Sequence, residues 1–566
     1  ENKLTEQFYR SKNITTNLMV TYNTKIGKHS IGGLLGYAYE GFSEKQFSTS
    51  RLTEDSKYDI FVGDLSGDKV SNTGSGSDWA IYSGFARATY NYDEKYLLEF
   101  NIRNDYSSYF AKGNRSGVFP SFSAGWRISE EKFWSVLKPY VPSLKIRGSW
   151  GLVGNNRIGA YQYMQTVSVT NGISFGDKLA QTATFASANP DLKWEANKTF
   201  NMGVDLGFLN QRITISPEFY INRSSNLLLN AQLPYSSGYQ SMLINAGETK
   251  NVGVELTVNT VNFSTKKFSW NTTLTLSHNK NSVKALTGEA VQLYEARFGF
   301  NQNTHRIAVG EPLGQFYGYI TEGLYQVDDF NYDASTQTYT LKDGIPYHGD
   351  KGRIRPGMWK FKNLAGDDNV IDENDKTVIG NAQPKFYGGL NNSFTYKGFD
   401  LSIFLTFSYG NEVLNATKLV TSKVGSLNYN ALDVMNSSNR WMTINSDGQK
   451  VTDPGELAAL NAGKTVAAYH DAQQGDNYIH SWAVEDASYL KLSNVTLGYT
   501  FPKNLIARVG LKNLRLYATG NNLLTWTKYS GFDPEVSTMK SGLTPGVDFG
   551  AYPLSRSFIF GLNVAF

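Results

Sequence analysis

The densest group of possible metal ligands in the sequence is the acidic segment 368–375, which reads DNVIDEND. Calcium binds six to eight oxygen atoms, and its protein loops place acidic side chains at alternating positions. If Asp368 is position 5 of such a loop, Asp372 and Asp375 fall at positions 9 and 12, and Asn369 can form the left-handed turn at position 6. Positions 1 and 3 then lack a side-chain oxygen. Two interpretations stay open, a Ca²⁺ site and a solvated acidic turn, and no other cofactor is suggested.

Catalytic chemistry has little support in the sequence. The 566 residues contain no cysteine, which excludes disulfides and cysteine-based zinc or redox sites within them. The six histidines lack the spacing of zinc ligands, and no Ser/His/acid grouping stands out for nucleophilic catalysis. We therefore predict that the protein is not an enzyme. The histidines are His29, His278, His305, His348, His470 and His480.

Aromatic residues in one polar region are the candidates for binding a ligand or a partner. Their rings could stack on sugars or pack against another protein. The alternative is that they pack long loops together without touching a ligand. These residues are Trp441, Tyr469, Tyr478 and Trp482.

The composition indicates the kind of element that must position these residues. Aromatic residues make up 14% of the chain and charged residues 18%, with 53 Gly and a mean hydropathy of −0.38. No run approaches the ~18 apolar residues of a spanning helix, so a helical membrane protein is excluded. A formal net charge of only +4, scattered along the chain, argues against nucleic acid as a partner. High aromatic and glycine content with few charges is typical of a transmembrane β-barrel.

Apolar and polar residues alternate along most of the chain, as they do in strands with two different faces. In one example, Leu401, Ile403, Leu405 and Phe407 alternate with polar residues that include Ser402, Thr406 and Ser408. We predict that the apolar set faces lipid and the polar set faces a hydrated lumen. This pattern gives fifteen strands, near 14–25, 30–47, 79–91, 95–109, 118–129, 144–155, 193–209, 211–229, 248–263, 268–280, 384–396, 399–411, 487–501, 512–525 and 554–566.

The connections between these strands alternate between tight turns and long loops. Tight turns include Asn210-Gln211 and Lys397-Gly398, whereas 50–78, 156–192, 281–383 and 412–486 are long. Short turns inside and long loops outside are typical of outer-membrane barrels. If the alternating stretch 316–325 were a spanning strand, the strands after it would run in the opposite direction to the one expected. We therefore place it within an outer loop. Asp453 before Pro454 predicts a short helix in another loop.

The two ends of the chain carry further expectations. The chain begins without a secretory segment or a globular plug, so we expect residues 1–566 to be the C-terminal barrel portion of a longer protein. In the last strand, Phe558, Phe560, Leu562, Val564 and Phe566 share one face. We predict that this amphipathic strand is the membrane-insertion signal, because an unpaired edge strand can template pairing. The alternative is that Phe566 belongs only to an inner aromatic girdle.

Several motifs resemble the SusC/RagA-type TonB-dependent transporters. The longest is SYLKLSNVTLGYTFP at 488–502, followed by GNNL at 520–523 and YSGFDPE at 529–535. NPDLKWE at 189–195, VGEPLG at 309–314 and VIGNAQP at 378–384 precede them in family order. Residues 1–188 agree in pattern rather than in motif.

The resemblance implies an all-β fold, with these strands forming the last fifteen of a 22-stranded barrel in the bacterial outer membrane. It further implies a plug and a TonB-ExbB-ExbD energy source that act through the missing N-terminal part, together with a SusD-like lipoprotein lid. The cargo would be a glycan or a peptide. An alternative function is a docking subunit of a larger outer-membrane complex that transports no nutrient, and a passive porin ranks third.

Overall fold

The structure is a computed structural model. It describes residues 2–53, 62, 70–175, 178–185, 187–239, 241–286, 291–295, 303–366, 368–422, 430–468, 478–538 and 541–566. The chain divides into two compact units. The first comprises Glu1–Gln211, Ile215–Val252 and Lys284–Gly288, and the second comprises Arg212–Thr214, Gly253–Val283 and Glu289–Phe566.

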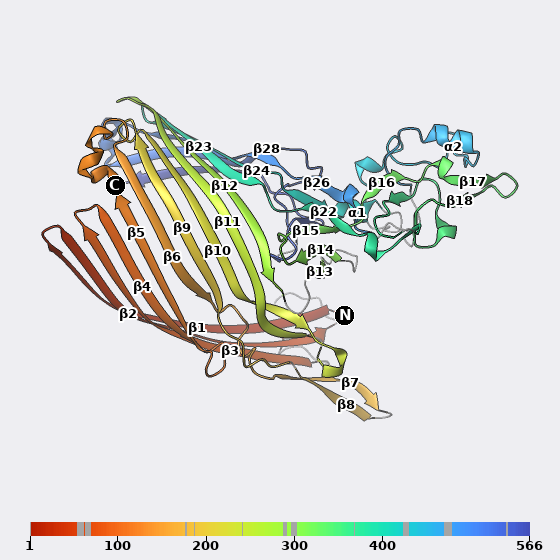
Figure 1. The fold of residues 1–566 in the computed structure, drawn as a ribbon, viewed down its shortest axis with the longest axis horizontal. Helices are drawn as coiled ribbons and strands as arrows, with labels where there is room; N and C mark the ends of the chain where they lie inside the picture. The colour runs from red at the N-terminus through yellow and green to blue at the C-terminus, as the bar shows by residue number, and fades with distance from the viewer. Residues whose placement is uncertain are drawn as a thin grey trace. The chain divides into compact units, whose positions relative to one another are not determined.

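The main element is a fifteen-stranded sheet whose neighbours largely follow chain order (Figure 1). Pairs of known register, such as the first two strands, are antiparallel. Each of the fifteen predicted segments overlaps one strand of this sheet. In order across the sheet, the strands are β1 (Asn2–Ile26), β2 (His29–Thr53), β3 (Val70–Tyr92), β4 (Tyr96–Ser107), β5 (Ser116–Arg127), β6 (Ser143–Asn155), β9 (Glu195–Phe208), β10 (Ile213–Gln232), β11 (Ser241–Ser264), β12 (Phe268–Ala285), β23 (Phe386–Tyr396), β24 (Phe399–Tyr409), β27 (Tyr489–Thr500), β28 (Asn513–Thr527) and β30 (Ser557–Ala565).

Alternation in the sequence becomes a difference between the two faces of the sheet, because residues that pair directly lie on the same face. Ile146 of β6 lies opposite Trp126 of β5 and Val204 of β9. The next residue, Arg147, lies opposite Gly125 and Gly203. One face is therefore apolar and aromatic, and the other carries the charged and small residues.

Tight turns join several pairs of consecutive strands, and the residues of these turns adopt left-handed backbone angles. Asp93 and Glu94, between β3 and β4, have φ of 52° and 56°. Lys397 and Gly398, between β23 and β24, have φ of 46° and 91°. Two successive positive φ values define the type I′ turn whose twist matches an antiparallel hairpin.

A bulge in β27 explains how its motif keeps leucines on the apolar face. Ser493 has no direct partner on β24, since Phe404 pairs with Asn494 and Leu405 with Leu492. One extra residue shifts the alternation by one place. Leu490 and Leu492 before the bulge, and Val495, Leu497 and Tyr499 after it, therefore lie on the same face.

The first three strands are longer than the sequence predicted. They contain 25, 25 and 23 residues, so the predicted loop 50–78 overlaps the end of β2 and the start of β3. Residues 42–53 and 70–78 are mostly polar or small, which hides their alternation in the sequence. Another predicted loop, 156–192, contains the hairpin β7 (Val167–Phe175) and β8 (Lys178–Phe185).

The long loops of the second unit fold into small sheets. As predicted, 316–325 lies outside the large sheet, in β15 and β16. The predicted helix is α2 (Pro454–Leu460), where the Asp453 side chain accepts a hydrogen bond from Glu456 N. The small strands are β13 (Val291–Glu295), β14 (Asn303–Ala308), β15 (Gln315–Gly318), β16 (Thr321–Leu324), β17 (Phe330–Asp333), β18 (Thr338–Leu341), β19 (Tyr347–His348), β20 (Trp359–Phe361), β21 (Val370–Ile371), β22 (Thr377–Asn381), β25 (Glu412–Asn415), β26 (Val484–Asp486) and β29 (Val547–Asp548), with helices α1 (Ala416–Thr421) and α3 (Lys503–Ile506). Among the described residues, no helix has the length and apolarity that a membrane span requires.

Candidate functional site

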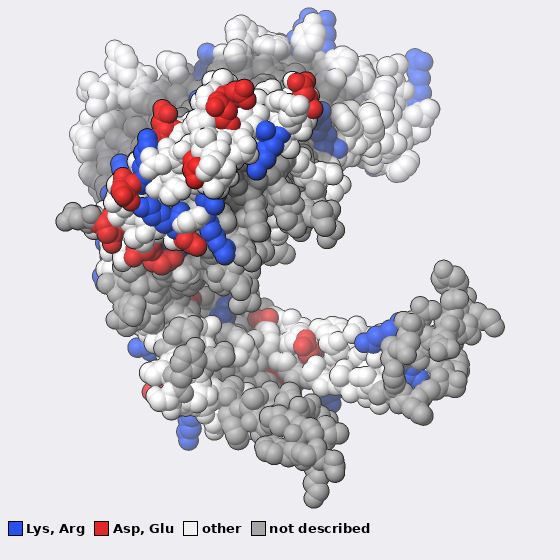
Figure 2. Space-filling model, turned by 90° about the vertical axis from the view of Figure 1, so that its right-hand side faces the viewer, with Lys and Arg blue, Asp and Glu red and all other residues white. Residues whose placement is uncertain are grey.

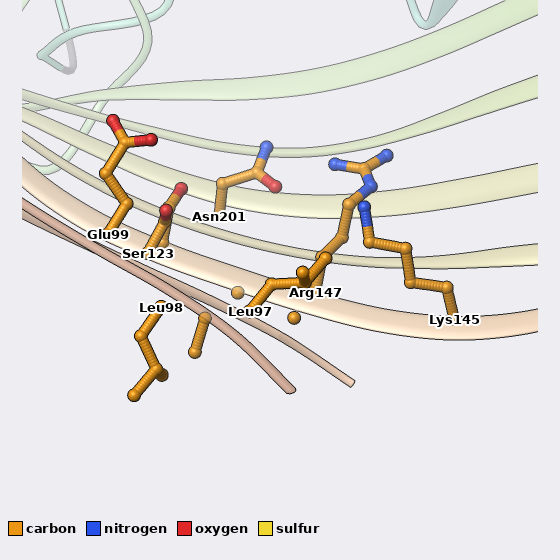
Figure 3. Close-up of a pocket in the computed structure, with 11 residues that line it drawn as sticks. Leu97, Leu98, Glu99, Ser123, Lys145, Arg147 and Asn201 are labelled. Carbon is orange, nitrogen blue, oxygen red and sulfur yellow. The ribbon is translucent and has the colours of Figure 1, made fainter. Parts of the chain in front are cut away.

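The polar face of the first unit bears a shallow cavity of about 260 Å³ (Figure 3). Glu99, Arg147 and Asn201 project to the same side of the sheet, whereas Leu98 points to the other side. The floor is closely packed at Gly125, where a Cβ would lie 3.2 Å from Lys145 Cε and 3.5 Å from Leu97 Cδ1. A charged and hydroxyl-bearing surface of this kind suits contact with water and polar solutes.

Several charges on this polar face are paired with one another. Arg147 donates to Asp205 and also to Glu218, whose second oxygen accepts from Asn201 at 3.2 Å. Arg103 donates to Asp105 at 2.6 Å. Pairing holds these side chains in place, so the face is polar without a strong excess of one sign.

In the second unit, two of the sequence motifs meet at one place, which we call the motif hub and define by Gly314, Asn381, Glu412 and Gly546. Ala382 N donates to Gly314 O at 2.9 Å, and Asn381 N donates to Glu412 Oε2 at 2.7 Å. Leu414 N donates to Gly546 O at 2.9 Å. VGEPLG and VIGNAQP therefore meet the start of the loop 412–486 and Gly546, which lies in the connection between β28 and β30.

Close packing at the motif hub requires Gly546. Its φ is 72°, and a Cβ there would lie 2.7 Å from the Ala382 Cβ and 3.1 Å from the Phe316 ring. Phe316 is fully buried in a cluster with Leu414, Leu419 and Val547. The hub thus packs against a buried core that connects the long loops to the ends of the sheet strands.

The YSGFDPE motif is attached to the same region by its acidic and hydroxyl groups. Tyr489 of β27 donates to Glu535 at 2.6 Å, and Lys491 donates to the other oxygen of that carboxylate. Tyr529 donates to the buried Asp548 at 2.6 Å. Burial and the hydrogen bond to Asp548 both raise the pKa of the Tyr529 phenol well above its ordinary value, so it stays a donor. A cavity of about 380 Å³ adjoins the hub, lined in part by Glu412, Tyr489 and Glu535.

The predicted ligand aromatics lie in or against a buried loop core. Trp441 is only 1% exposed, and Tyr478 and Trp482 pack on the cluster that contains it. The ring centres of Trp482 and Trp359 lie 4.9 Å apart, and Lys418 Nζ lies 4.1 Å from the centre of the Trp482 ring. For Trp441 the structure favours the loop-packing alternative over contact with a ligand. Tyr469 lies outside the described residues.

The predicted calcium ligands mainly hold the backbone of their loop. Asp375 is buried and accepts hydrogen bonds from the N–H groups of Leu364, Ala365 and Asp372 at 2.6–2.9 Å. Burial raises the pKa of its carboxyl, but these bonds outweigh that effect and hold it below its ordinary range. Asp372 accepts from Asn374 N, and Asp368 from Val370 N. Within the described part of the chain, no three acidic or histidine side chains gather as a metal site. The calcium site stays a prediction.

The last strand has the two faces that the sequence indicates. Phe558, Phe560, Leu562 and Val564 lie opposite Gly520, Ala518, Leu516 and Leu514 of β28. Phe560 and Phe566 are 82% and 80% exposed. The apolar face is therefore continuous from β28 to β30, and its role in membrane insertion stays a prediction.

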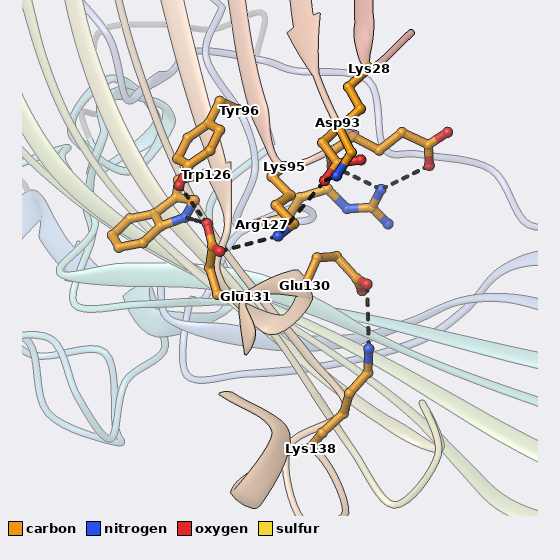
Figure 4. A network of polar contacts seen from close by, with 10 residues as sticks. Lys28, Asp93, Lys95, Tyr96, Trp126, Arg127, Glu130, Glu131 and Lys138 are labelled. Atoms are coloured by element: carbon orange, nitrogen blue, oxygen red, sulfur yellow. Dashed lines mark hydrogen bonds and ion pairs between the residues drawn. The ribbon is translucent and has the colours of Figure 1, made fainter. Parts of the chain in front are cut away.

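Sequence reasoning missed a network of charges and rings at the tight turns of the first unit (Figure 4). Glu131 accepts from Tyr96 at 2.5 Å, from Trp126 at 3.2 Å and from Lys95 at 3.2 Å. Lys28 pairs with Asp93 at 2.8 Å. The network joins three alternate connections, β1–β2, β3–β4 and β5–β6, which lie at the same end of the strands. A signal was present in the acidic pair at 130–131, which lies three residues beyond the end of β5.

Charges in the long loops of the second unit are also mixed in sign. Lys360 pairs with Asp329 at 3.2 Å, and Lys376 with Glu373 at 2.7 Å. Figure 2 shows Lys and Arg side chains interspersed with Asp and Glu on one face of the molecule. The face drawn there lacks the extended basic patch of a nucleic-acid-binding surface among its described residues.

A large antiparallel sheet with one apolar face, joined by tight turns and long folded loops, is characteristic of outer-membrane β-barrel proteins. A sequence profile described as "TonB dependent receptor-like, beta-barrel" matches residues 2–347, more than half of the chain. The chain belongs to this family. Its members are transporters and receptors rather than enzymes.

Individual relatives agree with this assignment. The chain is 31% identical to TonB-dependent receptor P3 of Formosa agariphila, over 99% of this chain and 53% of that protein. It is 28% identical to TonB-dependent receptor SusC of Bacteroides thetaiotaomicron, over 98% of this chain and 50% of that protein. The chain thus spans about half the length of the curated relatives that it matches.

Among solved structures, the chain is similar to the RagAB peptide transporter, with a TM-score of 0.78 and 24% identity. The match covers all of this chain and 56% of that one. At this identity the likeness establishes the fold alone.

Proposed function

We propose that the protein imports oligomeric nutrients across the outer membrane as a TonB-dependent transporter of the SusC type. The apolar face of the sheet would contact lipid, and the polar face with Glu99, Arg147 and Asn201 would line the path of the solute. Fifteen strands would form the later part of a 22-stranded barrel, with the plug in the remainder of a longer protein.

The observation that carries this proposal is the motif hub. It secures two long loops at the ends of β23, β24 and β27, where the loops form a folded layer with its own buried core. A folded layer at the mouth of a barrel is suited to contact with a solute or a lid. A pore that only filters by size has less need of such a layer.

We infer that a SusD-like lipoprotein covers this layer and that TonB-ExbB-ExbD supplies the energy. The likeness to SusC and to the RagAB peptide transporter supports this partnership and a glycan or peptide cargo. A non-transporting docking subunit is the competing function, since long folded loops suit partner binding as well.

Uptake by living cells tests the proposal. Cells with and without the intact gene would be supplied with labelled glycan and peptide oligomers, before and after a protonophore collapses the proton gradient. The proposal expects uptake of one cargo class that needs both the gene and the gradient. Gene-dependent uptake that survives the protonophore would indicate a passive pore. Unchanged uptake of every oligomer, together with loss of other proteins from a purified complex, would favour the docking function.

A further inference from the structure

The connection between β5 and β6 contains a short helical segment that the transport proposal does not use. Residues 132–136 form a 3₁₀ helix. Lys138 N donates to Trp134 O at 2.9 Å, and Val141 N donates to Leu137 O at 2.8 Å, which extends the helical turns to residue 141. The Trp134 indole donates to Val141 O at 2.9 Å and closes the end. We call residues 131–141 the rim segment.

One side of the rim segment is apolar and uncovered. Its exposed apolar residues follow the spacing i, i+3, i+4, i+7, which places them on one side of helical turns. A protein surrounded by water rarely exposes such a group without a partner. The residues are Phe133, Val136, Leu137 and Tyr140, with 64%, 78%, 46% and 75% of their surface exposed.

The start of the rim segment is fastened to the sheet. Glu131 is held by Tyr96, Trp126 and Lys95, as Figure 4 shows. Ile128 and Ser129, directly before it, are buried. The segment is therefore held in place, and its apolar side does not result from a loose chain end.

The apolar side continues the apolar face of the sheet. Phe133 meets Trp126 edge-on with ring centres 6.5 Å apart, and Trp126 stacks on Tyr96 at 6.3 Å. Tyr96 in turn stacks on Tyr92 at 6.2 Å. Trp126 and Tyr96 lie on the face that carries Leu98 and Phe100, since these residues alternate along β4 and pair across β5.

We propose that the rim segment lies in the bilayer interface, with Phe133, Val136, Leu137 and Tyr140 inserted at the boundary between headgroups and acyl chains. Amphipathic segments bind membranes in this way, with the apolar side buried and the charged side in water. Lys132 flanks the apolar side, where a long cationic side chain can reach lipid phosphates, and Lys138 on the same segment pairs with Glu130 at 3.3 Å. The segment would fix the depth of the barrel at the side of its tight turns. This inference rests on the proposed placement of the sheet in a membrane.

Site-directed spin labelling of the full-length protein tests the placement. Single labels would be attached at Val136→Cys, at its neighbour Ser135→Cys, at Phe100→Cys on the apolar sheet face and at Asp447→Cys in an exposed loop turn. The protein would be reconstituted alone in phosphatidylethanolamine and phosphatidylglycerol vesicles. Collision rates would be measured with oxygen, which is enriched in lipid, and with a water-soluble nickel chelate.

The expected result is that the label at Val136 collides with oxygen but loses most of its collisions with nickel, and that the label at Ser135 keeps more of them. Nickel access at Val136 equal to that at Asp447, with Phe100 in lipid, would overturn the rim-segment proposal alone. Shielding of Val136 from both reagents would overturn it too, because it would mean contact with protein. Nickel access at Phe100 would refute the membrane placement of the sheet itself.

Discussion

Arg515 of β28 holds Asp400 of β24 with hydrogen bonds of 2.9 and 2.5 Å that pass over the strand between them at Gly498. A Cβ at position 498 would lie 2.5 Å from both Arg515 Nη2 and Asp400 Oδ1. The first unit repeats the arrangement, because Arg147 of β6 reaches Glu218 of β10 over Gly203 of β9. In each unit a glycine, which has no side chain, leaves room for an arginine to reach across one strand and join two strands that are not neighbours.

Replacing Gly498 by valine should uncouple Arg515 from Asp400. Valine suits a strand, but its side chain would occupy the path of the ion pair. The coupling energy between Asp400→Asn and Arg515→Gln, which we expect to be at most about 1 kcal/mol for a partly exposed pair, should fall towards zero. Urea unfolding in lipid vesicles gives this energy. It compares the unchanged protein, the two single variants and the double variant, each with and without Gly498→Val. An unchanged coupling energy would show that the ion pair does not depend on the glycine.

Charge on the two faces of β24 should have different costs. Ile403 lies opposite Val495 on the apolar face, whereas Thr406 contacts Ser493 Oγ at 2.6 Å on the polar face. An arginine on a lipid face near the bilayer centre costs about 2–4 kcal/mol. Ile403→Arg should therefore lower the free energy of unfolding in vesicles by that amount, and Thr406→Arg by much less. Equal losses would contradict the assignment of the faces.

Most of the sheet could be predicted from the sequence because alternation is a local property. Leu401, Ile403 and Leu405 show it within five residues, and a tight turn such as Lys397-Gly398 marks where the chain reverses. The prediction was poorest where polar residues occupy both faces, as in the extended ends of β1, β2 and β3. There the pairing with neighbouring strands maintains the extended structure, and the sequence of one strand alone has no alternating pattern that would predict it.

The arrangement of the long loops could not be derived in the same way. The motif hub joins Gly314, Asn381, Glu412 and Gly546, which lie far apart in sequence and meet only after several small sheets have formed. Trp441 shows the consequence, since the sequence leaves open whether this aromatic residue contacts a ligand or packs the loops together, and it lies in the loop core. The family motifs indicated which segments matter but not that they contact one another.

Trypsin added to intact cells should distinguish the two ends of the sheet. Arg353 lies in the long loop 281–383, and Arg212 directly follows the tight turn at Asn210-Gln211; both are exposed. In a strain that lacks the proposed lid, trypsin should cut after Arg353 and spare Arg212, because the membrane would separate the enzyme from the tight turns. Mass spectrometry of the fragments identifies the site. First cleavage after Arg212 would mean that the topology is inverted.

His348 gives the loop core a dependence on pH. It is 5% exposed, neither ring nitrogen has a hydrogen-bond partner among the residues that the structure describes, and the centres of the Phe361 and Tyr478 rings lie 5.0 and 5.5 Å away. Burial lowers the pKa of its imidazole from 6.5 to about 4. Between these values the unfolded chain binds a proton that the folded chain does not, so stability is full above pH 6.5 and falls as the pH approaches 4. The shift corresponds to a loss of at most roughly 3 kcal/mol.

His348→Phe should stabilise the loop core and weaken its dependence on pH. Phenylalanine fits among the same rings and removes two unpaired polar atoms, whose burial costs about 1–3 kcal/mol. Hydrogen exchange of peptides from 319–361, corrected for intrinsic rates, should show slower opening at pH 7.5 and a smaller acceleration at pH 5. His305 is the matched control, because its pKa is also lowered to about 4 but its ring hydrogen-bonds Pro545 O at 2.9 Å. His305→Phe leaves the Pro545 carbonyl without its donor. The backbone around residue 305 should therefore exchange faster at pH 7.5 in this variant. Faster opening of His348→Phe at pH 7.5 would mean that the imidazole has a polar partner in the folded protein.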